Sequence, residues 1–193
     1  MDDFEGLVLP AQLTGIIEET RRLRFVYASD LLLGSLLRTL AATKPGGKFL
    51  ELGTGTGVGT SWLLDGMDVR AELTSIDRDP AVQEVARKAL GGDGRVRFIT
   101  GDGGEFIRSH AAESYDLIFA DGGPGKLSDT DVALRLLRRG GIYVGDDLCP
   151  HLLEPPDRAG RVREFLASLS GRQDVVVTRL SWSSGLVVCA RRN

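Results

Sequence analysis

The chain has 193 residues, of which 42% are hydrophobic and 26% are charged, and its formal net charge is −3. These values are typical of one soluble globular domain with a single core. Basic residues are interleaved with acidic ones, which argues against a nucleic-acid-binding protein, because such proteins gather Lys and Arg on one surface. The acidic start Met1–Glu5 lacks the features of a signal peptide, and no apolar run could span a bilayer. We therefore expect a cytoplasmic protein in which Cys149 and Cys189 are reduced thiols.

Hydrophobic periodicity predicts two helices over residues 10–43, followed by seven short strands. The predicted strands are Lys48–Leu52, Ala71–Ile76, Val96–Thr100, Tyr115–Ala120, Gly141–Gly145, Val175–Leu180 and Leu186–Ala190. Helical segments separate the first five, which indicates βαβ units and a parallel sheet. Residues 181–185 are too few for a crossover helix, so the last two strands should form an antiparallel hairpin. We expect an α/β, Rossmann-like doubly wound sheet in a single domain, 1–193, with residues 1–44 as a helical cover over the pocket mouth and residues 45–193 as the cofactor-binding core.

A glycine-rich segment, Glu51-Leu-Gly-Thr-Gly-Thr-Gly57, follows directly from the first predicted strand and leads into a helix. Glycines at such a turn let the backbone bend tightly and let a ligand approach main-chain N–H groups. A dinucleotide site would need the spacing G-x-G-x-x-G, and neither Val58 nor Thr60 supplies its last small residue. The segment instead has the acid-x-G-x-G-x-G pattern of class I methyltransferases. Glu51 would then lie beside the ammonium group of S-adenosylmethionine.

Acidic residues also end the second and third predicted strands. Asp77 lies 20 positions past Gly57, where a carboxylate can accept hydrogen bonds from both ribose hydroxyls. Asp79 before Pro80 fits a helix N-cap. Asp102 with Gly103 would suit the adenine ring, although a cap for the next helix explains Asp102 equally well. The predicted cofactor-binding residues are Glu51, Gly53, Thr54, Gly55, Gly57, Thr60, Asp77, Arg78, Asp102, Gly103 and Asp121.

With these motifs the chain resembles the catechol and caffeoyl-CoA type of O-methyltransferases, and more closely small bacterial methyltransferases of that kind, from about residue 28 onward. Stretches similar to the bacterial group are Phe119–Lys126, Gly145–Leu148 and Trp182–Gly185. Gly34 matches a glycine of the cofactor-contacting Glu-Gly segment in the family, but Leu33 stands in place of its Glu. The resemblance implies S-adenosyl-L-methionine as methyl donor and S-adenosylhomocysteine as product.

The same resemblance aligns Asp121, Asp146 and Asp147 with the Mg²⁺ ligands of catechol-type enzymes, with Asp147 in place of an Asn. Three carboxylates would suit Mg²⁺ or Ca²⁺. Alternatively, Asp121 steadies the methionine end of the cofactor while the other two cap backbone groups. The catalytic candidates are Asp121, Lys126 and Asp146. Lys126 is either a base or orienting cation, or a solvated lysine behind a Pro-Gly turn.

Three further side chains have simpler interpretations beside a functional one. His151 is a second candidate base, because an imidazole titrates near neutrality, although a loop histidine in solvent is commoner. His110 is expected at the end of a helix as a surface cap. Trp182 is expected to pack against the edge of the sheet.

The sequence thus predicts an enzyme that transfers a methyl group from S-adenosylmethionine, most simply to oxygen on a small-molecule acceptor. A cofactor-binding sensor without turnover and an aminopropyl transferase remain as alternatives. An NAD(P) oxidoreductase is disfavoured by the glycine spacing and by the terminal hairpin. We expect neither nucleic acid nor membrane as a partner, and the sequence leaves a homodimer open.

Overall fold

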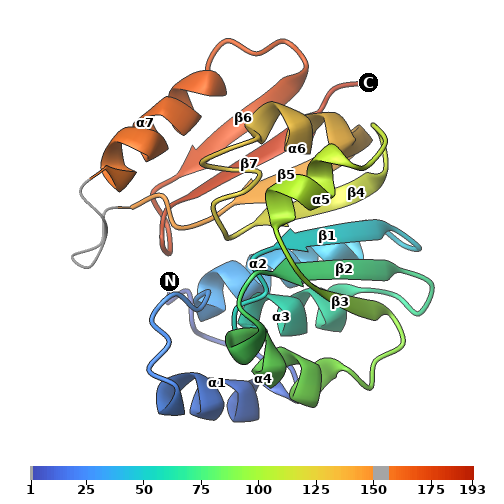
Figure 1. The fold of residues 1–193 in the computed structure, drawn as a ribbon, viewed down its shortest axis with the longest axis vertical. Helices are drawn as coiled ribbons and strands as arrows, with labels where there is room; N and C mark the ends of the chain where they lie inside the picture. Colours follow the sequence, from blue (N-terminus) through green and yellow to red (C-terminus); the bar gives the residue numbers. More distant parts are fainter. Residues whose placement is uncertain (1, 150–156) are drawn as a thin grey trace.

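A computed structural model describes residues 2–149 and 157–193 of the chain. Its seven strands form one sheet in the order β3-β2-β1-β4-β5-β7-β6 (Figure 1). The strands are β1 (Lys48–Leu52), β2 (Glu72–Asp77), β3 (Val96–Thr100), β4 (Tyr115–Ala120), β5 (Leu137–Gly145), β6 (Val175–Leu180) and β7 (Leu186–Arg191). Strands β1 to β5 pair in parallel, and β7 is antiparallel to both β5 and β6. The predicted parallel sheet with a terminal hairpin is therefore confirmed.

Seven helices within the described residues cover both faces of the sheet. They are α1 (Leu13–Arg22), α2 (Leu31–Ala42), α3 (Val58–Gly66), α4 (Pro80–Leu90), α5 (Gly103–Arg108), α6 (Thr130–Leu136) and α7 (Arg158–Ser168). Helices α1 to α4 contribute to one hydrophobic cluster, and α5 to α7 contribute to a second cluster on the opposite face. The central strands contribute residues to both clusters: Phe49 belongs to the first and its neighbour Leu50 to the second. Such two-sided burial is typical of parallel strands.

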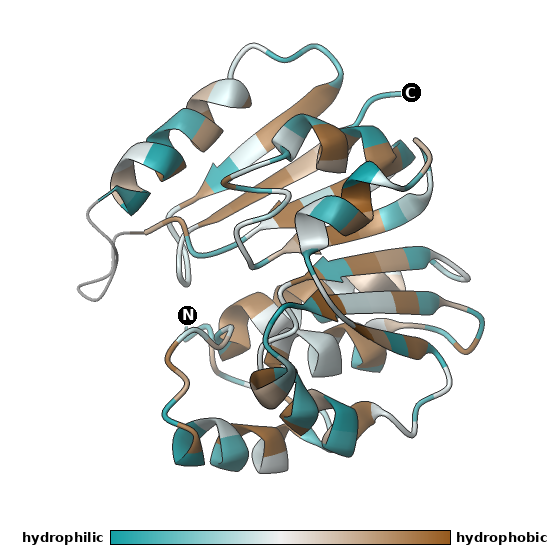
Figure 2. Ribbon diagram, viewed as in Figure 1, coloured by the Kyte–Doolittle hydropathy of each residue, from teal (hydrophilic) through white to brown (hydrophobic). Residues whose placement is uncertain are grey.

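The amphipathic helices bury one side and expose the other. Figure 2 shows α1 and α7 with alternating hydrophilic and hydrophobic bands. In α1 the buried residues Leu13, Ile16 and Thr20 lie three or four positions apart, which is the spacing of one helical face. None of the helices in residues 2–149 and 157–193 is long and apolar enough to cross a membrane.

The N-terminal helices differ in one respect from the expectation of a cover over the pocket mouth. Helix α1 packs on α3 and α4, and α2 packs on α3, so both helices mainly complete the core on one face of the sheet. The connection between them carries Phe25 and Tyr27, which line a cavity at the C-terminal ends of the strands. Gly34 packs closely on Trp62, and a Cβ atom on Gly34 would lie 2.2 Å from the indole ring. This glycine therefore serves core packing.

The fifth strand begins earlier than predicted, at Leu137 rather than Gly141. Gly140 has a φ of +71°, and a Cβ atom on Gly141 would lie 2.7 Å from the Arg138 carbonyl oxygen, so the chain turns locally inside this strand. The pairing with β4 shifts register between Tyr115 and Leu117 to accommodate this extra length. The longer strand still ends at Gly145, as predicted.

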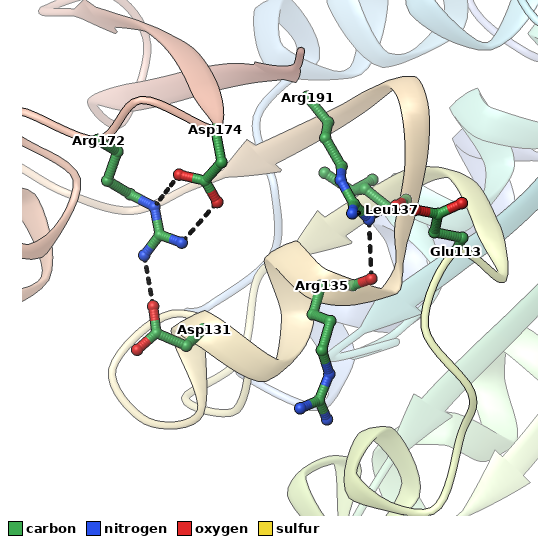
Figure 3. Close-up of polar contacts among 7 residues, drawn as sticks. All are labelled: Glu113, Asp131, Arg135, Leu137, Arg172, Asp174 and Arg191. Carbon is green, nitrogen blue, oxygen red and sulfur yellow. Dashed lines mark hydrogen bonds and ion pairs between the residues drawn. The ribbon is translucent and has the colours of Figure 1, made fainter. Parts of the chain in front are cut away.

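Arginine contacts tie the C-terminal strands to the layer of α6 (Figure 3). Arg172, before β6, forms ion pairs with Asp131 of α6 and with Asp174. Arg191 of β7 donates to the carbonyl oxygens of Arg135 and Leu137 and pairs with Glu113. Within the described part of the chain, Cys149 and Cys189 are free thiols.

Candidate functional site

The glycine turn after β1 adopts left-handed backbone conformations that favour glycine. Gly53, Gly55 and Gly57 have φ angles of +106°, +54° and +96°. A Cβ atom on Gly53 would lie 2.6 Å from the backbone nitrogen of Gly122, which follows β4. Gly57 is the N-cap of α3 and packs against α4, where a Cβ would lie 2.7 Å from that of Ala86. The glycines therefore shape the turn and let it lie close to its neighbours.

Asp77 joins the end of β2 to this turn. Its carboxylate accepts a hydrogen bond from the Gly55 N–H at 2.7 Å and another from the Asp79 N–H at 2.9 Å. The side chain also lines both cavities beside the turn. Asp79 accepts from two N–H groups in the first turn of α4, directly before Pro80, so its predicted role as N-cap is confirmed. The position of Asp77 fits a ribose contact, and the contact itself remains a prediction.

Two adjacent cavities open at this edge of the sheet. The smaller, of about 300 Å³, lies among Gly53, Asp77, Arg78, Asp102, Gly103 and Pro124. The larger, of about 480 Å³, shares Gly53, Asp77 and Arg78 and extends to Phe25, Tyr27, Asp121, Lys126, Asp147 and Arg158. Their volumes are in the range of small-molecule sites, and their location at the carboxyl ends of parallel strands is where open α/β sheets bind ligands.

Asp102 proves to be a helix cap that also faces a cavity. Its Oδ1 atom accepts from the Glu105 N–H at 2.8 Å and so caps α5. The residue is nonetheless exposed and, with Gly103, lines the smaller cavity. Both sequence interpretations of Asp102 are thus compatible with one conformation, because the cap uses one carboxylate oxygen.

Glu51 lies buried beneath the glycine turn. Its Oε2 atom accepts from the hydroxyls of Thr60 and Ser75, each at 2.5 Å. Its Oε1 atom has no hydrogen-bond partner among the residues that the structure describes. Burial raises the pKa of this carboxyl to about 8, although the two hydroxyl hydrogen bonds oppose the rise. An unpartnered buried carboxylate oxygen is costly and indicates a missing polar partner.

Two threonines of the predicted cofactor set support this carboxylate and its surroundings. Thr60 donates to Glu51, and Thr54 shares a 2.6 Å hydrogen bond with Ser75. Both threonines are buried, at 0% and 4% exposure, and neither lines the two cavities described above. They therefore stabilise the buried side of the glycine turn through these hydrogen bonds.

The predicted catalytic aspartates follow β4 and β5, which are neighbours in the sheet. Asp121 accepts from the Ser29 hydroxyl at 2.9 Å. Asp146, which is 2% exposed, accepts from the Asp147 N–H at 2.5 Å and from the Ser184 hydroxyl. Asp147 forms an ion pair with Arg158. Desolvation raises the pKa of Asp121, and the nearby charge of Asp146 adds to the rise.

Lys126 lies between the ends of these two strands. The side chain is 2% exposed, so the interpretation as a solvated lysine is wrong. Its Nζ atom donates to the backbone carbonyls of Asp146 at 2.5 Å and of Asp121 at 3.2 Å. Burial lowers the pKa of the ammonium group, while the surrounding aspartates oppose that shift.

The predicted metal ligands do not form a metal site in this arrangement. Within residues 2–149 and 157–193, no group of three or more His, Cys, Asp or Glu side chains is placed to hold a metal ion. The carboxylates of Asp121, Asp146 and Asp147 face separate partners, and the Lys126 ammonium lies where the strand ends converge. The residues present therefore do not fit a divalent ion.

His110 and Trp182 make structural contacts away from the two cavities. His151 lies outside the described residues. His110 stacks on Phe106 with ring centroids 3.9 Å apart, and its Nδ1 lies 2.7 Å from the Phe106 carbonyl oxygen at the end of α5, as expected of a cap. Trp182 packs on the core and donates its Nε1–H to Asp3.

Several residues around the cavities were not predicted from the sequence. They are Phe25, Tyr27, Ser29, Arg158, Arg161 and Ser184. The sequence signal for Ser29 is weak: the residue lies directly before Asp30, the N-cap of α2. Arg158 and Arg161 lie in the first turn of α7 and carry no motif.

Comparison with known proteins agrees with this geometry. Residues 50–148 match the model of a family described as a methyltransferase domain. A Mycolicibacterium smegmatis protein, provisionally named an O-methyltransferase, is 41% identical over 117 residues, which are 58% of this chain and 56% of that protein. The chain thus spans little more than half the length of this relative.

Two solved structures illustrate the shared fold. The Streptomyces achromogenes O-methyltransferase TomG, in complex with S-adenosylmethionine, has a TM-score of 0.83 at 22% identity, covering 98% of this chain and 93% of that one. A Bacillus cereus O-methyltransferase in complex with S-adenosylhomocysteine has a TM-score of 0.83 at 20% identity, covering 97% and 94%. Because the family match extends over more than half of the chain and includes the glycine turn, Asp77 and the ends of β4 and β5, this chain belongs to the methyltransferase domain family.

Proposed function

We propose that this chain binds S-adenosylmethionine and transfers its methyl group to an oxygen of a small-molecule acceptor. The observation that carries the proposal is the Oε1 atom of Glu51, a buried carboxylate oxygen that has no partner among the described residues. It faces Gly59 in the first turn of α3, where a Cβ atom would lie 2.8 Å from it, directly after the glycine turn. The ammonium group of the methionine moiety, directly or through a water molecule, would supply the missing donor and favour the charged carboxylate.

The rest of the cofactor would follow the edge of the sheet. The ribose hydroxyls would donate to Asp77, which keeps lone pairs beyond its two backbone hydrogen bonds. The adenine would occupy the smaller cavity beside Asp102 and Gly103, with Arg78 at the mouth. The methyl group would then point into the larger cavity, toward Asp121.

Methyl transfer from a sulfonium needs alignment more than activation. The donor is already reactive, so the protein must place the acceptor oxygen in line with carbon and sulfur and exclude water, an effect worth about 7–11 kcal/mol. Phe25 and Tyr27 line the larger cavity and would contribute to this task.

The proton of an acceptor hydroxyl must also be removed. Asp121 lines the larger cavity, and desolvation raises its pKa toward neutrality, which makes it the best-placed base. Lys126 is less suitable because its ammonium group already donates to two carbonyls.

The cofactor assignment is tested by binding. S-adenosylhomocysteine should raise the melting temperature in step with its saturation, whereas NAD and NADP should have no effect. Calorimetry that detects NAD but not S-adenosylhomocysteine would refute the assignment.

The reaction is tested by its products. Incubation with S-adenosylmethionine and a panel of small hydroxyl compounds should release S-adenosylhomocysteine. An aminopropyl transferase would instead release methylthioadenosine from the decarboxylated donor. A protein that binds the cofactor but forms neither product with any acceptor would be a sensor.

A further inference from the structure

Lys126 brings a buried amino group to the junction of β4 and β5. Its Nζ atom contacts the backbone carbonyls of Asp121 and Asp146, the two residues that follow these strands. The charges of Asp121, Asp146 and Asp147 all favour its protonated form. Backbone carbonyls and carboxylates are also the oxygen ligands that a hard divalent ion would select.

The loop before α6 is built to deliver this side chain. Gly125 has a φ of +79°, and a Cβ atom there would lie 2.6 Å from Leu52 Cδ1. Its carbonyl accepts from the buried Tyr143 hydroxyl at 2.8 Å. On the other side, the carbonyl of Lys126 accepts from the Thr130 hydroxyl at 2.7 Å. Both flanks of Lys126 are thus fixed, which directs the lysine inward.

We propose that the Lys126 ammonium takes the place of a divalent cation, so that this methyltransfer site is organised by a lysine and excludes Mg²⁺ and Ca²⁺. The Lys126 ammonium already occupies the backbone carbonyls of Asp121 and Asp146, and the carboxylate of Asp147 is paired with Arg158. A divalent ion at the same point would lie beside the ammonium and meet strong repulsion. It would also have to displace the hydroxyl hydrogen bonds of Ser29 and Ser184 to the aspartates.

In this arrangement Lys126 is a positioning residue. By holding the backbone of Asp121 and of Asp146, it fixes the distance between two strand ends. The Asp121 carboxylate is thereby presented to the larger cavity without being a ligand to a metal. The inference deepens the proposed function and rests on it for its catalytic meaning, while its charge argument is independent of the cofactor.

The experiment is a titration of Mn²⁺ into protein near neutral pH, with unbound Mn²⁺ measured by electron paramagnetic resonance. The parent should bind no stoichiometric Mn²⁺ up to about 1 mM, the weak end of protein sites for hard cations. Lys126→Ala removes the charge and leaves room for an ion. It should therefore bind one Mn²⁺ with a Kd at least about tenfold below the 1 mM limit set for the parent. Lys44→Met is the matched control, because Lys44 also donates to a carbonyl, that of Gly140, but lies outside the cluster.

Nuclear magnetic resonance of the parent provides a measurement that needs no variant. Mn²⁺ should leave the amide signals of Asp121 and Asp146 unbroadened. Selective broadening of these signals, or one tightly bound Mn²⁺ in the parent, would overturn the proposal. A folded Lys126→Ala protein that still binds no Mn²⁺ would overturn it as well. S-adenosylhomocysteine binding is measured on the same samples, so a failure of the cofactor assignment is recognised separately.

Discussion

The two halves of the active edge are built in different ways. On the side of β1 and β2, most contacts of the turn stay within the β1–α3–β2 unit: Thr60 and Glu51 are 9 positions apart, and Gly55 and Asp77 are 22 apart, whereas Thr20 reaches Thr56 across 36. On the side of β4 and β5, Lys126 reaches Asp121 and Asp146 across 5 and 20 positions, but Ser29 reaches Asp121 across 92 and Ser184 reaches Asp146 across 38. The first half is therefore built mainly within one βαβ unit, and the second also takes side chains from distant parts of the chain.

This difference assigns different tasks to the two halves. A turn made of backbone and glycine can fit only one shape of ligand, which suits an invariant cofactor. Side chains delivered from the N-terminal connection and the β6–β7 turn can change without disturbing the sheet, which suits a variable acceptor. Substitutions on the first side should therefore affect both folding and cofactor binding, whereas those on the second should separate the two.

The largest expected effect is that of Gly53→Ala. The substitution combines a positive φ with a Cβ atom 2.6 Å from the Gly122 nitrogen, so we expect a loss of about 2–4 kcal/mol in unfolding free energy and loss of S-adenosylhomocysteine binding. Urea unfolding and calorimetry would measure both. Gly171→Ala is the matched control, because Gly171 has a φ of +75° but no atom within 4 Å of its Cβ position. If both variants lose the same stability, the close approach to Gly122 has no energetic role.

The next effect is that of Asp77→Ala on the cofactor. Loss of hydrogen bonds to a charged acceptor costs about 1.5–3 kcal/mol, so S-adenosylhomocysteine binding should weaken by one to two decades. The comparison is Asp79→Ala, which removes the cap of α4 and one residue lining the larger cavity; it should cost about 1 kcal/mol of stability and weaken binding less than Asp77→Ala does. Equal affinities for Asp77→Ala and the parent would show that Asp77 serves only the turn.

The contrast between local and distant contacts also explains which features could be predicted from the sequence. The strand ends and the acids at Glu51, Asp77 and Asp102 follow from patterns within a few residues; Asp77 and Asp102 line the same cavity, and Glu51 is buried in β1 next to it in the sheet. The burial of Lys126 could not be predicted, because it depends on Gly125 approaching Leu52 of a distant strand. The positions of Ser29 and Ser184 likewise depend on the tertiary fold. The metal prediction rested on the residue types at the strand ends. Those residue types do not show that the side chain of Lys126 lies among them.

A third effect concerns the pH dependence of stability. Burial raises the pKa of Glu51 from 4.5 to about 8, so the folded state retains a proton that the unfolded state loses between these values. This stabilisation is complete below pH 4.5 and is lost as the pH rises toward 8, by up to about 1.4 kcal/mol per pH unit. Glu51→Gln should remove this contribution, leaving a shallower slope of unfolding free energy against pH.

The effect of S-adenosylhomocysteine on this pH dependence tests the proposed function. Its ammonium group should favour the charged carboxylate and flatten the pH dependence of the parent, with protons released on binding below pH 8. Calorimetry in buffers of different ionisation enthalpy counts these protons. Equal release from the parent and Glu51→Gln would contradict an ammonium site at Glu51.

The smallest expected effect lies outside both halves, at the arginine contacts of Figure 3. Arg172→Met removes the ion pairs with Asp131 and Asp174, which are 81% and 53% exposed and therefore well solvated. The variant should lose at most about 1 kcal/mol of unfolding free energy, less in high salt, because exposed pairs are screened. Its affinity for S-adenosylhomocysteine should equal that of the parent, since the contacts lie beyond the cavities. A binding defect as large as that of Asp77→Ala would mean that the edge of the sheet controls the site, and that the two halves are not independent.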